Sequence, residues 1–146
     1  MMDMTSEIMK PLAVLAAWTM VMWIWMYITR IPAMNAAKLN PDELVKQGGQ
    51  TLDQLLPAQV QWKAQNYNHL HEAPTVFYAV ALALALMGQG DGLNATLAWA
   101  YVGLRIVHSL VQATVNKVMV RFLIFALSSL VLMALVLHTV MAAFAA

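Results

Sequence analysis

The sequence predicts an all-α integral membrane protein in which a single domain, residues 1–146, forms a bundle of four transmembrane helices. Composition gives the first reason: hydrophobic residues make up 62% of the chain and charged residues 10%, against about 25% charged residues in soluble domains. The distribution of apolar residues gives the second reason. They form four blocks separated by polar stretches, and each block is close to the roughly 20 residues that a bilayer requires.

The first apolar block predicts a transmembrane helix over about residues 11–29. No charged residue interrupts the chain between Lys10 and Arg30, and no small-residue cleavage site follows the block. We therefore expect a retained membrane span and not a signal peptide. Pro32 is expected to end this helix, because proline has no amide hydrogen to donate and its ring clashes with the preceding turn.

A polar loop is predicted over about residues 31–56. Within it, Asn40 followed by Pro41 is the start signal of a short helix, because asparagine caps the first amide groups and proline fits the first helical turn. Gly48 and Gly49 are expected to end that helix. The charged side chains of this loop are expected to be solvated and to take no part in chemistry.

The second block predicts a transmembrane helix over about residues 66–88. The helical pattern begins earlier, after Pro57, and at about 1.5 Å per residue the stretch to Met87 is too long for one crossing. Its first part should therefore project into water. Pro74 lies inside the pattern and is expected to kink the helix just after Glu72.

Third and fourth transmembrane helices are predicted over about residues 95–115 and 118–140, after a glycine-rich turn at 88–94. Three polar side chains interrupt the third block at a spacing that places them on one face of a helix: Arg105, His108 and Gln112. The fourth block carries a charge near its beginning, at Arg121. Charged and polar groups of the two blocks should therefore lie near each other.

Charge in the connections predicts the orientation of the chain. Basic residues gather after the first and third spans, at Arg30, Lys38, Lys46, Lys63, Lys117 and Arg121. The opposite side offers Lys10. Because basic residues are enriched on the cytoplasmic side, we expect the loop over about residues 31–56 to be cytoplasmic and both termini to be non-cytoplasmic.

The charges at the cytoplasmic end allow two interpretations. A carboxylate at the edge of the hydrocarbon costs several kcal/mol unless a cation or hydrogen-bond donor meets it, and Arg105 is the expected partner of Glu72. Such an ion pair could simply hold two helices together. One glutamate does not require several cations, however, and the excess of positive charge suits an anionic ligand. The cations at this end include Arg30, Arg105, Lys117 and Arg121.

Composition and spacing argue against several other functions. The absence of cysteine excludes thiol-disulfide exchange, iron-sulfur sites and cysteine nucleophiles. A net charge of +1 without clustered cations gives no basis for nucleic-acid binding. His69 and His71 are two residues apart and point to different faces of a helix, so we expect no metal ion and no haem.

Two segments resemble the family of membrane-associated proteins in eicosanoid and glutathione metabolism, the MAPEG family. They are NHLHEAPTVFYAV at residues 68–80 and YVGLRIVHS at residues 101–109. The resemblance covers nearly the whole chain in order and spacing. It implies a left-handed four-helix bundle that forms a homotrimer and contacts membrane lipid. It also implies glutathione bound at the subunit interface near the cytoplasmic side, for conjugation to lipophilic small molecules or for reduction of lipid hydroperoxides.

The resemblance also implies roles for individual residues. Arg30, Glu72 and Arg105 match the family's basic position at the end of the first helix, its second-helix glutamate and its third-helix arginine. The expected glutathione-binding residues are Arg30, Asn68, His69, Glu72, Arg105, His108 and Gln112. Arginine forks suit the two carboxylates of glutathione, and Glu72 suits its amino group. Arg121 or Lys117 is expected to face the sulfur as the catalytic cation.

The chain differs from the family's enzymes at three positions, where Gln65 replaces an arginine, His69 an asparagine and Gln112 a tyrosine. Two other functions therefore stay open. One is a non-catalytic member of the same fold that binds another anion or a lipid head group. The other is a small proton-coupled exporter that uses Glu72 as its carrier carboxylate.

Overall fold

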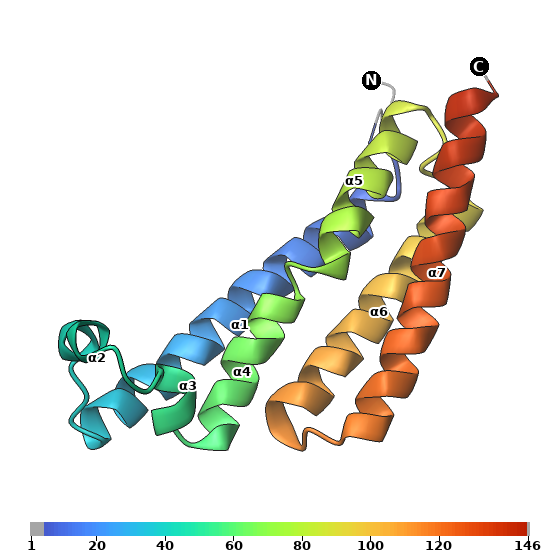
Figure 1. Ribbon diagram of the computed structural model, residues 1–146. Coiled ribbons are helices and arrows are strands. Elements are labelled where there is room, and N and C mark those ends of the chain that lie inside the picture. Colours follow the sequence, from blue (N-terminus) through green and yellow to red (C-terminus); the bar gives the residue numbers. More distant parts are fainter. Residues whose placement is uncertain (1–4, 146) are drawn as a thin grey trace.

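The computed structural model describes residues 5–145, and these residues form helices joined by turns, with no strand among them. The helices are α1 (Met9–Ala36), α2 (Pro41–Gln47), α3 (Leu52–Leu55), α4 (Ala58–His69), α5 (Ala73–Leu86), α6 (Leu93–Thr114) and α7 (Val118–Phe144), as Figure 1 shows. The predicted all-α fold class is confirmed.

The long helices form one elongated bundle (Figure 1). Helix α6 packs along α7, and α4 packs against both α1 and α6, whereas α5 packs against α7 and α1. The residue before α1 is tied to the turn between α5 and α6, because the amide of Ile8 donates to the carbonyl oxygen of Gly90 at 3.0 Å. The C-terminal end of α7 lies at the same end of the bundle.

Three helical stretches are long and apolar enough to cross a membrane: Met9–Ala36, Ala58–Leu86 and Val118–Phe144. Large apolar side chains on their outer surfaces are exposed, including Ile28 and Met133, as expected for residues that face lipid. Helix α6 is less apolar, because it carries the polar face around Arg105. The protein is therefore an integral membrane protein.

The prediction that Pro32 ends the first helix is wrong. Helix α1 continues through Pro32 to Ala36. Proline at this position removes a single backbone hydrogen bond, the one to the carbonyl oxygen of Ile28, from a helix of 28 residues. The residues that follow, Ala33 to Ala36, include good helix formers, so the helix resumes beyond the defect.

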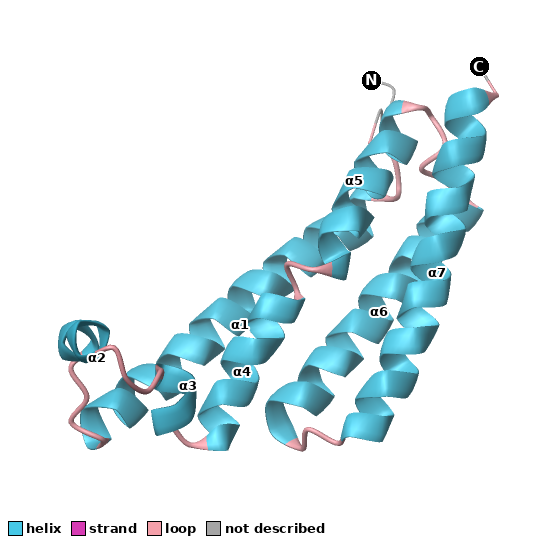
Figure 2. Cartoon of the chain, viewed as in Figure 1, coloured by secondary structure: helices cyan, strands magenta, loops and turns pink. Residues whose placement is uncertain are grey.

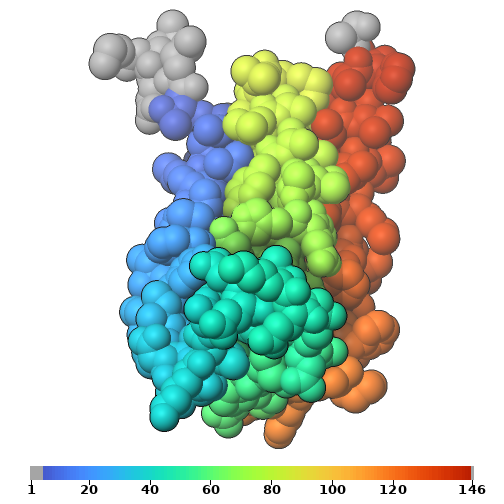
Figure 3. Space-filling model, turned by 60° about the vertical axis from the view of Figure 1, so that its left-hand side comes forward, coloured from blue at the N-terminus to red at the C-terminus, as the bar shows by residue number. Residues whose placement is uncertain are grey.

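The predicted short helix in the loop is confirmed as α2. The side chain of Asn40 accepts from the amide of Asp42 at 3.1 Å, and Pro41 is the first helical residue. Gly48 ends the helix with a φ of 59°, a left-handed conformation that glycine adopts without strain. Figure 3 shows the segment with α2 and α3 as a lobe on the lower half of the molecule.

The second predicted span is broken and not merely kinked. Helix α4 ends at His69, and α5 begins at Ala73 after a turn, drawn in pink in Figure 2. Pro74 is the second residue of α5, where its missing amide hydrogen is not needed. The break changes the packing partners of the chain, because α4 lies against α6 and α5 lies against α7. Glu72 is placed at this junction.

The turn between α5 and α6 leaves no room for a side chain at Gly90. A Cβ atom there would lie 2.7 Å from Cγ2 of the fully buried Ile8 and 3.2 Å from Cα of Ala85. Gly90→Ala should therefore destabilise the protein by about 1–3 kcal/mol, the usual cost of overpacking. Thermal melting in detergent measures the effect. Gly49→Ala is the matched control, because nothing lies within 4 Å of its Cβ position. Equal melting temperatures would contradict this packing.

Candidate functional site

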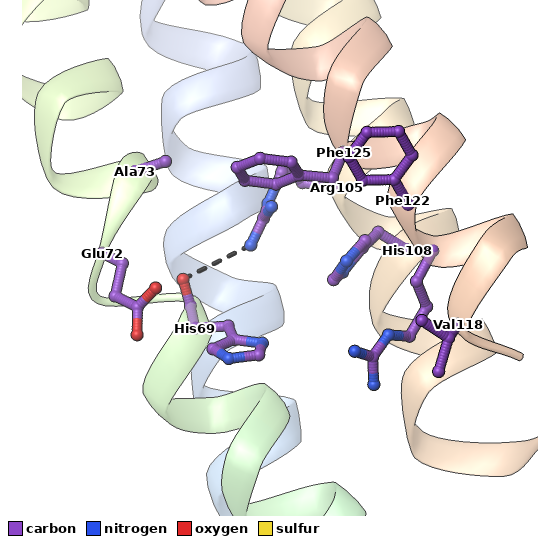
Figure 4. Close-up of a pocket in the computed structure, with 9 residues that line it drawn as sticks. His69, Glu72, Ala73, Arg105, His108, Val118, Phe122 and Phe125 are labelled. Atoms are coloured by element: carbon purple, nitrogen blue, oxygen red, sulfur yellow. Dashed lines mark hydrogen bonds between the residues drawn. The ribbon is translucent and has the colours of Figure 1, made fainter. Parts of the chain in front are cut away.

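A cavity of about 310 Å³ lies between the α4–α5 junction, α6 and α7 (Figure 4). It is lined by His69, Glu72, Ala73, Arg105, His108, Val118, Arg121, Phe122 and Phe125. The polar side chains come from the junction, from α6 and from the first turn of α7. The apolar side chains come mostly from α7. The cavity therefore has a charged wall and an aromatic wall.

Arg105 is the most deeply buried charge in the cavity, with 2% of its surface exposed. Its Nη2 donates to the carbonyl oxygen of His69 at 3.3 Å, drawn as the dashed line in Figure 4. Because α4 ends at His69, that carbonyl has no partner in its own helix; it accepts from the amide of Glu72 at 3.3 Å and from Arg105 with its second lone pair. The break in the second span thus creates the position that Arg105 occupies.

The expected ion pair between Glu72 and Arg105 does not form. Glu72 is exposed at the junction, and the ion pair found among residues 5–145 joins Arg30 to Asp53. In Figure 4 the carboxylate of Glu72 lies at one side of the cavity and His108 at the other. The helix break explains the difference, because Glu72 does not continue the helical face of His69. The carboxylate is left available to a ligand.

His69 and Gln112 are joined behind the cavity wall. Nδ1 of His69 lies 3.0 Å from Oε1 of Gln112, and Gln112 is fully buried. His69 lines the cavity, whereas Gln112 is not among the lining residues. In the structure Gln112 therefore supports His69 and does not itself line the cavity.

His108 and Arg121 complete the charged wall. His108 is 5% exposed, and its ring centroid is 6.5 Å from that of His69. Arg121 is held by a hydrogen bond from its guanidinium to the side chain of Asn116, which ends the turn between α6 and α7 in a left-handed conformation. Lys117 is exposed and does not line the cavity. Of the two cations, Lys117 before α7 and Arg121 in its first turn, Arg121 thus lines the cavity.

Arg30 and Asn68 line a different cavity, of about 230 Å³, together with Asp53 and Gln65. Nη2 of Arg30 lies 3.9 Å from Oδ1 of Asp53. Within one chain, the predicted site residues are therefore divided. His69, Glu72, Arg105, His108 and Arg121 meet at the first cavity, whereas Arg30 and Asn68 meet at the second.

The prediction from sequence missed the aromatic wall. Phe122 and Phe125 are 59% and 44% exposed on α7, and both line the cavity. The sequence did contain a signal for Phe125. It lies four residues after Arg121, a spacing that places the two side chains on one helical face. These exposed rings give the cavity an apolar surface on α7.

These features define a class of protein: an all-α integral membrane protein whose helices surround a cavity lined by a buried arginine, a half-buried arginine and aromatic rings. A model of the MAPEG family matches residues 8–141, nearly the whole chain. The chain belongs to the MAPEG family, whose members are membrane proteins of glutathione and eicosanoid metabolism. No curated protein and no solved structure matched the chain.

Proposed function

We propose that the protein is a glutathione-dependent transferase or peroxidase that acts on lipophilic electrophiles or lipid hydroperoxides. The observation that supports this function is a set of buried polar atoms in the residues that line the cavity. Nε of Arg105, Nδ1 of His108 and Nε of Arg121 have no hydrogen-bond partner within the described part of the chain. Buried polar atoms without partners are costly, and several of them around one cavity are typical of a site that completes its hydrogen bonds with a ligand.

Glutathione matches this arrangement group by group. Arg105 binds a carboxylate, because a guanidinium fork pairs with both carboxylate oxygens. Glu72 binds the amino group, for which its exposed carboxylate is available. Arg121 faces the sulfur, where a fixed positive charge in a poorly hydrated site favours the thiolate over the thiol. The cavity volume falls at the lower end of the range for small-molecule sites, about 300–1,000 Å³.

Arg30 and Asn68 join the site from a neighbouring subunit of a homotrimer. Two observations support this assembly. Arg30 and Asn68 line a second cavity and not the first, and Asn68 is exposed. The side chain of Arg30 is also exposed in part and has Asp53 as its ion-pair partner at the long distance of 3.9 Å. The second carboxylate of glutathione would compete with Asp53 for Arg30.

Four helical segments cross the membrane: α1, α4 together with α5, α6, and α7. At about 1.5 Å per residue, the 22 residues of α6 reach across the hydrocarbon, and its buried face carries the polar groups, including Arg105, His108 and Gln112. Lipid would then meet the apolar side of α6, with Val107 and Leu110. The segment with α2 and α3 is cytoplasmic, both termini are non-cytoplasmic, and the cavity lies nearer the cytoplasmic side.

The chemistry requires a thiolate and an apolar path. A lipophilic electrophile enters between Phe122 and Phe125, the thiolate sulfur forms a bond to its carbon, and the leaving group departs with the electron pair. With a hydroperoxide, the sulfur attacks the distal oxygen, the O–O bond breaks, and an alcohol leaves after gaining a proton. A second glutathione thiol then displaces water from the sulfenic acid and gives the disulfide. Arg121 supplies the charge that keeps the sulfur ionised at each attack.

A second candidate function is non-catalytic binding of an anionic lipid head group. The exposed rings of Phe122 and Phe125 favour it, because an acyl chain packed on them would place its head group at the buried cations. This function needs Arg105 and Arg121 but no thiol and no aqueous co-substrate.

Thermal melting in detergent separates the two functions. A ligand present at one hundred times its Kd stabilises the protein by about 2.7 kcal/mol, so glutathione should raise the Tm by several degrees. The tripeptide analogue without sulfur should give a smaller rise, because it lacks the contact to Arg121. An anionic lipid should raise the Tm no more than a neutral lipid does. A rise with anionic lipid alone, and none with millimolar glutathione, would favour the second function and contradict the first.

A further inference from the structure

We propose that Nε2 of His69 accepts the proton of the glutathione thiol, and that Gln112 holds the imidazole ring in the tautomer that this step requires. The inference rests on the proposed function and adds two residues to its chemistry. His69 lines the cavity and takes part in the reaction itself. Gln112 acts through His69 and is therefore a positioning residue.

The bond between the two side chains determines which nitrogen of His69 carries the hydrogen. Nδ1 of His69 lies 3.0 Å from Oε1 of Gln112. An amide oxygen can only accept a hydrogen bond, so Nδ1 is the donor and carries the hydrogen. In a neutral imidazole the other nitrogen, Nε2, then holds a lone pair and can accept a proton. Gln112 is fully buried, so water does not compete for this bond.

Nε2 is also the nitrogen of His69 that a ligand can reach. The two nitrogens point in different directions from the ring, and Nδ1 is turned toward Gln112, behind the cavity wall. Nε2 is not among the buried polar atoms that lack a partner within residues 5–145. In the view of Figure 4, the ring of His69 lies between Glu72 and His108. The lone pair of Nε2 is therefore open to the space that the ligand occupies.

The other polar groups that line the cavity are less suited to accept the proton. Arg105 and Arg121 are guanidiniums that stay protonated and cannot accept. His108 is 5% exposed, and its Nδ1 is buried. Glu72 is exposed at the junction and, in the proposed function, is engaged by the amino group of glutathione. Nε2 of His69 is therefore the neutral acceptor that this cavity offers to a thiol.

Two contacts to α6 hold His69 in place. Its carbonyl oxygen accepts from Nη2 of Arg105 at 3.3 Å, and its Nδ1 donates to Gln112, seven residues further along α6. The backbone and the ring of His69 are thus fixed by the same helix. A base held in this way needs little reorganisation when the thiol arrives, and such fixed geometry is what efficient proton transfer requires.

The step keeps atoms and charges in balance. The S–H bond breaks, the proton moves to Nε2 of His69, and the ring becomes imidazolium. The electron pair stays on the sulfur, which becomes a thiolate beside Arg121. The sulfur then forms its bond to the electrophile, and the leaving group departs with its electron pair. Imidazolium returns the proton to that leaving group, or to the alkoxide oxygen when the substrate is a hydroperoxide.

The fate of this proton gives a test. Thiolate formed on binding is measured by its ultraviolet absorbance, and the released proton is measured with a pH indicator in weakly buffered detergent solution. Helix α1 also packs against α4, but its cation Arg30 lines the second cavity. The charged or titratable groups that face His69 stay unchanged in a His69 variant, so the ratio of proton released to thiolate formed isolates the part of His69. They are Glu72 at the junction, Arg105 and His108 on α6, and Arg121 on α7.

The expected ratio of proton released to thiolate formed is well below one in the unchanged protein. His69→Asn should raise the ratio to about one, form about tenfold less thiolate and lower turnover of a lipophilic electrophile about a hundredfold, within the range of general base catalysis. Nδ2 of asparagine can replace Nδ1 as the donor to Gln112, so this variant removes Nε2 and keeps the bond. His71→Asn is the matched control, because His71 is exposed, bonds to the carbonyl oxygen of Tyr67 at 2.9 Å and lies outside the cavity.

Gln112→Met tests the positioning role, and it also serves if His69→Asn does not fold. Methionine has a similar length but no oxygen to accept from Nδ1, so the ring of His69 is no longer held in one tautomer. The ratio of proton to thiolate should rise toward one, while the affinity for glutathione stays within a few-fold. A lower melting temperature with an unchanged ratio would reduce Gln112 to a packing residue and overturn its positioning role.

Glutathione affinity, measured by calorimetry in the same samples, separates this proposal from the proposed function. Suppose that the unchanged protein binds glutathione but forms no thiolate, or releases one proton for each thiolate. The role of His69 is then wrong, while the glutathione site stands. The same conclusion holds if His69→Asn leaves both the ratio and the turnover unchanged. If the unchanged protein binds no glutathione, both proposals are overturned.

Discussion

Arg105→Met should weaken glutathione binding by about tenfold to a hundredfold while the protein stays folded. Arg105 is 2% exposed, and its Nε has no partner within residues 5–145, so its charge is available to a carboxylate. Hydrogen bonds to charged groups contribute about 1.5–3 kcal/mol, which corresponds to this loss of affinity. Methionine keeps much of the buried volume, and because Arg105 has no carboxylate partner among residues 5–145, the change leaves no buried counter-charge unpaired. Isothermal titration calorimetry measures the affinity and thermal melting measures the stability.

Two further variants sharpen this prediction. Arg105→Lys keeps the charge but not the fork, so its affinity should lie between those of the unchanged protein and Arg105→Met. Lys10→Met is the matched control, because Lys10 is exposed and lies at the start of α1, at the opposite end of the bundle from α4. An affinity of Arg105→Met equal to that of Lys10→Met would mean that the buried arginine only holds the helices together.

Arg121→Gln should lower kcat by about a hundredfold and leave the KM for glutathione within a few-fold. The guanidinium acts on the charge of the sulfur, which grows as the thiol ionises, and removing one such donor typically costs about 10²–10³ in kcat. The bond from Arg121 to Asn116 fixes the side chain at the cavity, so little reorganisation is needed when the ligand binds. Steady-state kinetics with a lipophilic electrophile measure both parameters.

Lys117→Gln distinguishes between Lys117 and Arg121, the two cations that were predicted to face the sulfur. Lys117 is exposed and does not line the cavity, so its loss should change kcat by less than a factor of two. Lys46→Gln, on the exposed helix α2, gives the baseline for removing a surface charge. A large loss of kcat in Lys117→Gln, with none in Arg121→Gln, would assign the thiolate to Lys117 and refute the arrangement described here.

Local chemistry in the sequence predicted several of the turns and caps between the helices. The asparagine cap at Asn40, the glycine turn with Gly88 and Gly92, and the break at Asn116 appear in the structure because each depends on a few neighbouring residues. Proline was harder to interpret. Pro32 is tolerated inside α1, whereas Pro74 begins a new helix, and both outcomes are compatible with its missing amide hydrogen. The packing around the chain, which sequence does not show, decides between them.

The sequence predicted part of the candidate site, because helical spacing is local whereas the packing between helices is not. Helical spacing placed Arg105 and His108 on one face of the third block, and both line the cavity. The same spacing could not show that Gln112 turns toward His69, because the rotation of α4 against α6 sets that contact. Nor could it show that Arg30 and Asn68 line a second cavity, since this follows from the packing of α4 against α1.

Protection of a single cysteine tests most directly whether the cavity between the α4–α5 junction, α6 and α7 binds the ligand. The chain has no cysteine of its own, so Val118→Cys in the cavity and Val45→Cys on α2 each introduce one thiol. Both valines are exposed, at 65% and 82%, and both thiols should react with a water-soluble thiosulfonate reagent. Saturating S-methylglutathione, which cannot consume the reagent, should slow the reaction at position 118 about tenfold and leave position 45 unchanged. Equal rates at position 118 with and without the ligand would contradict a glutathione site in this cavity.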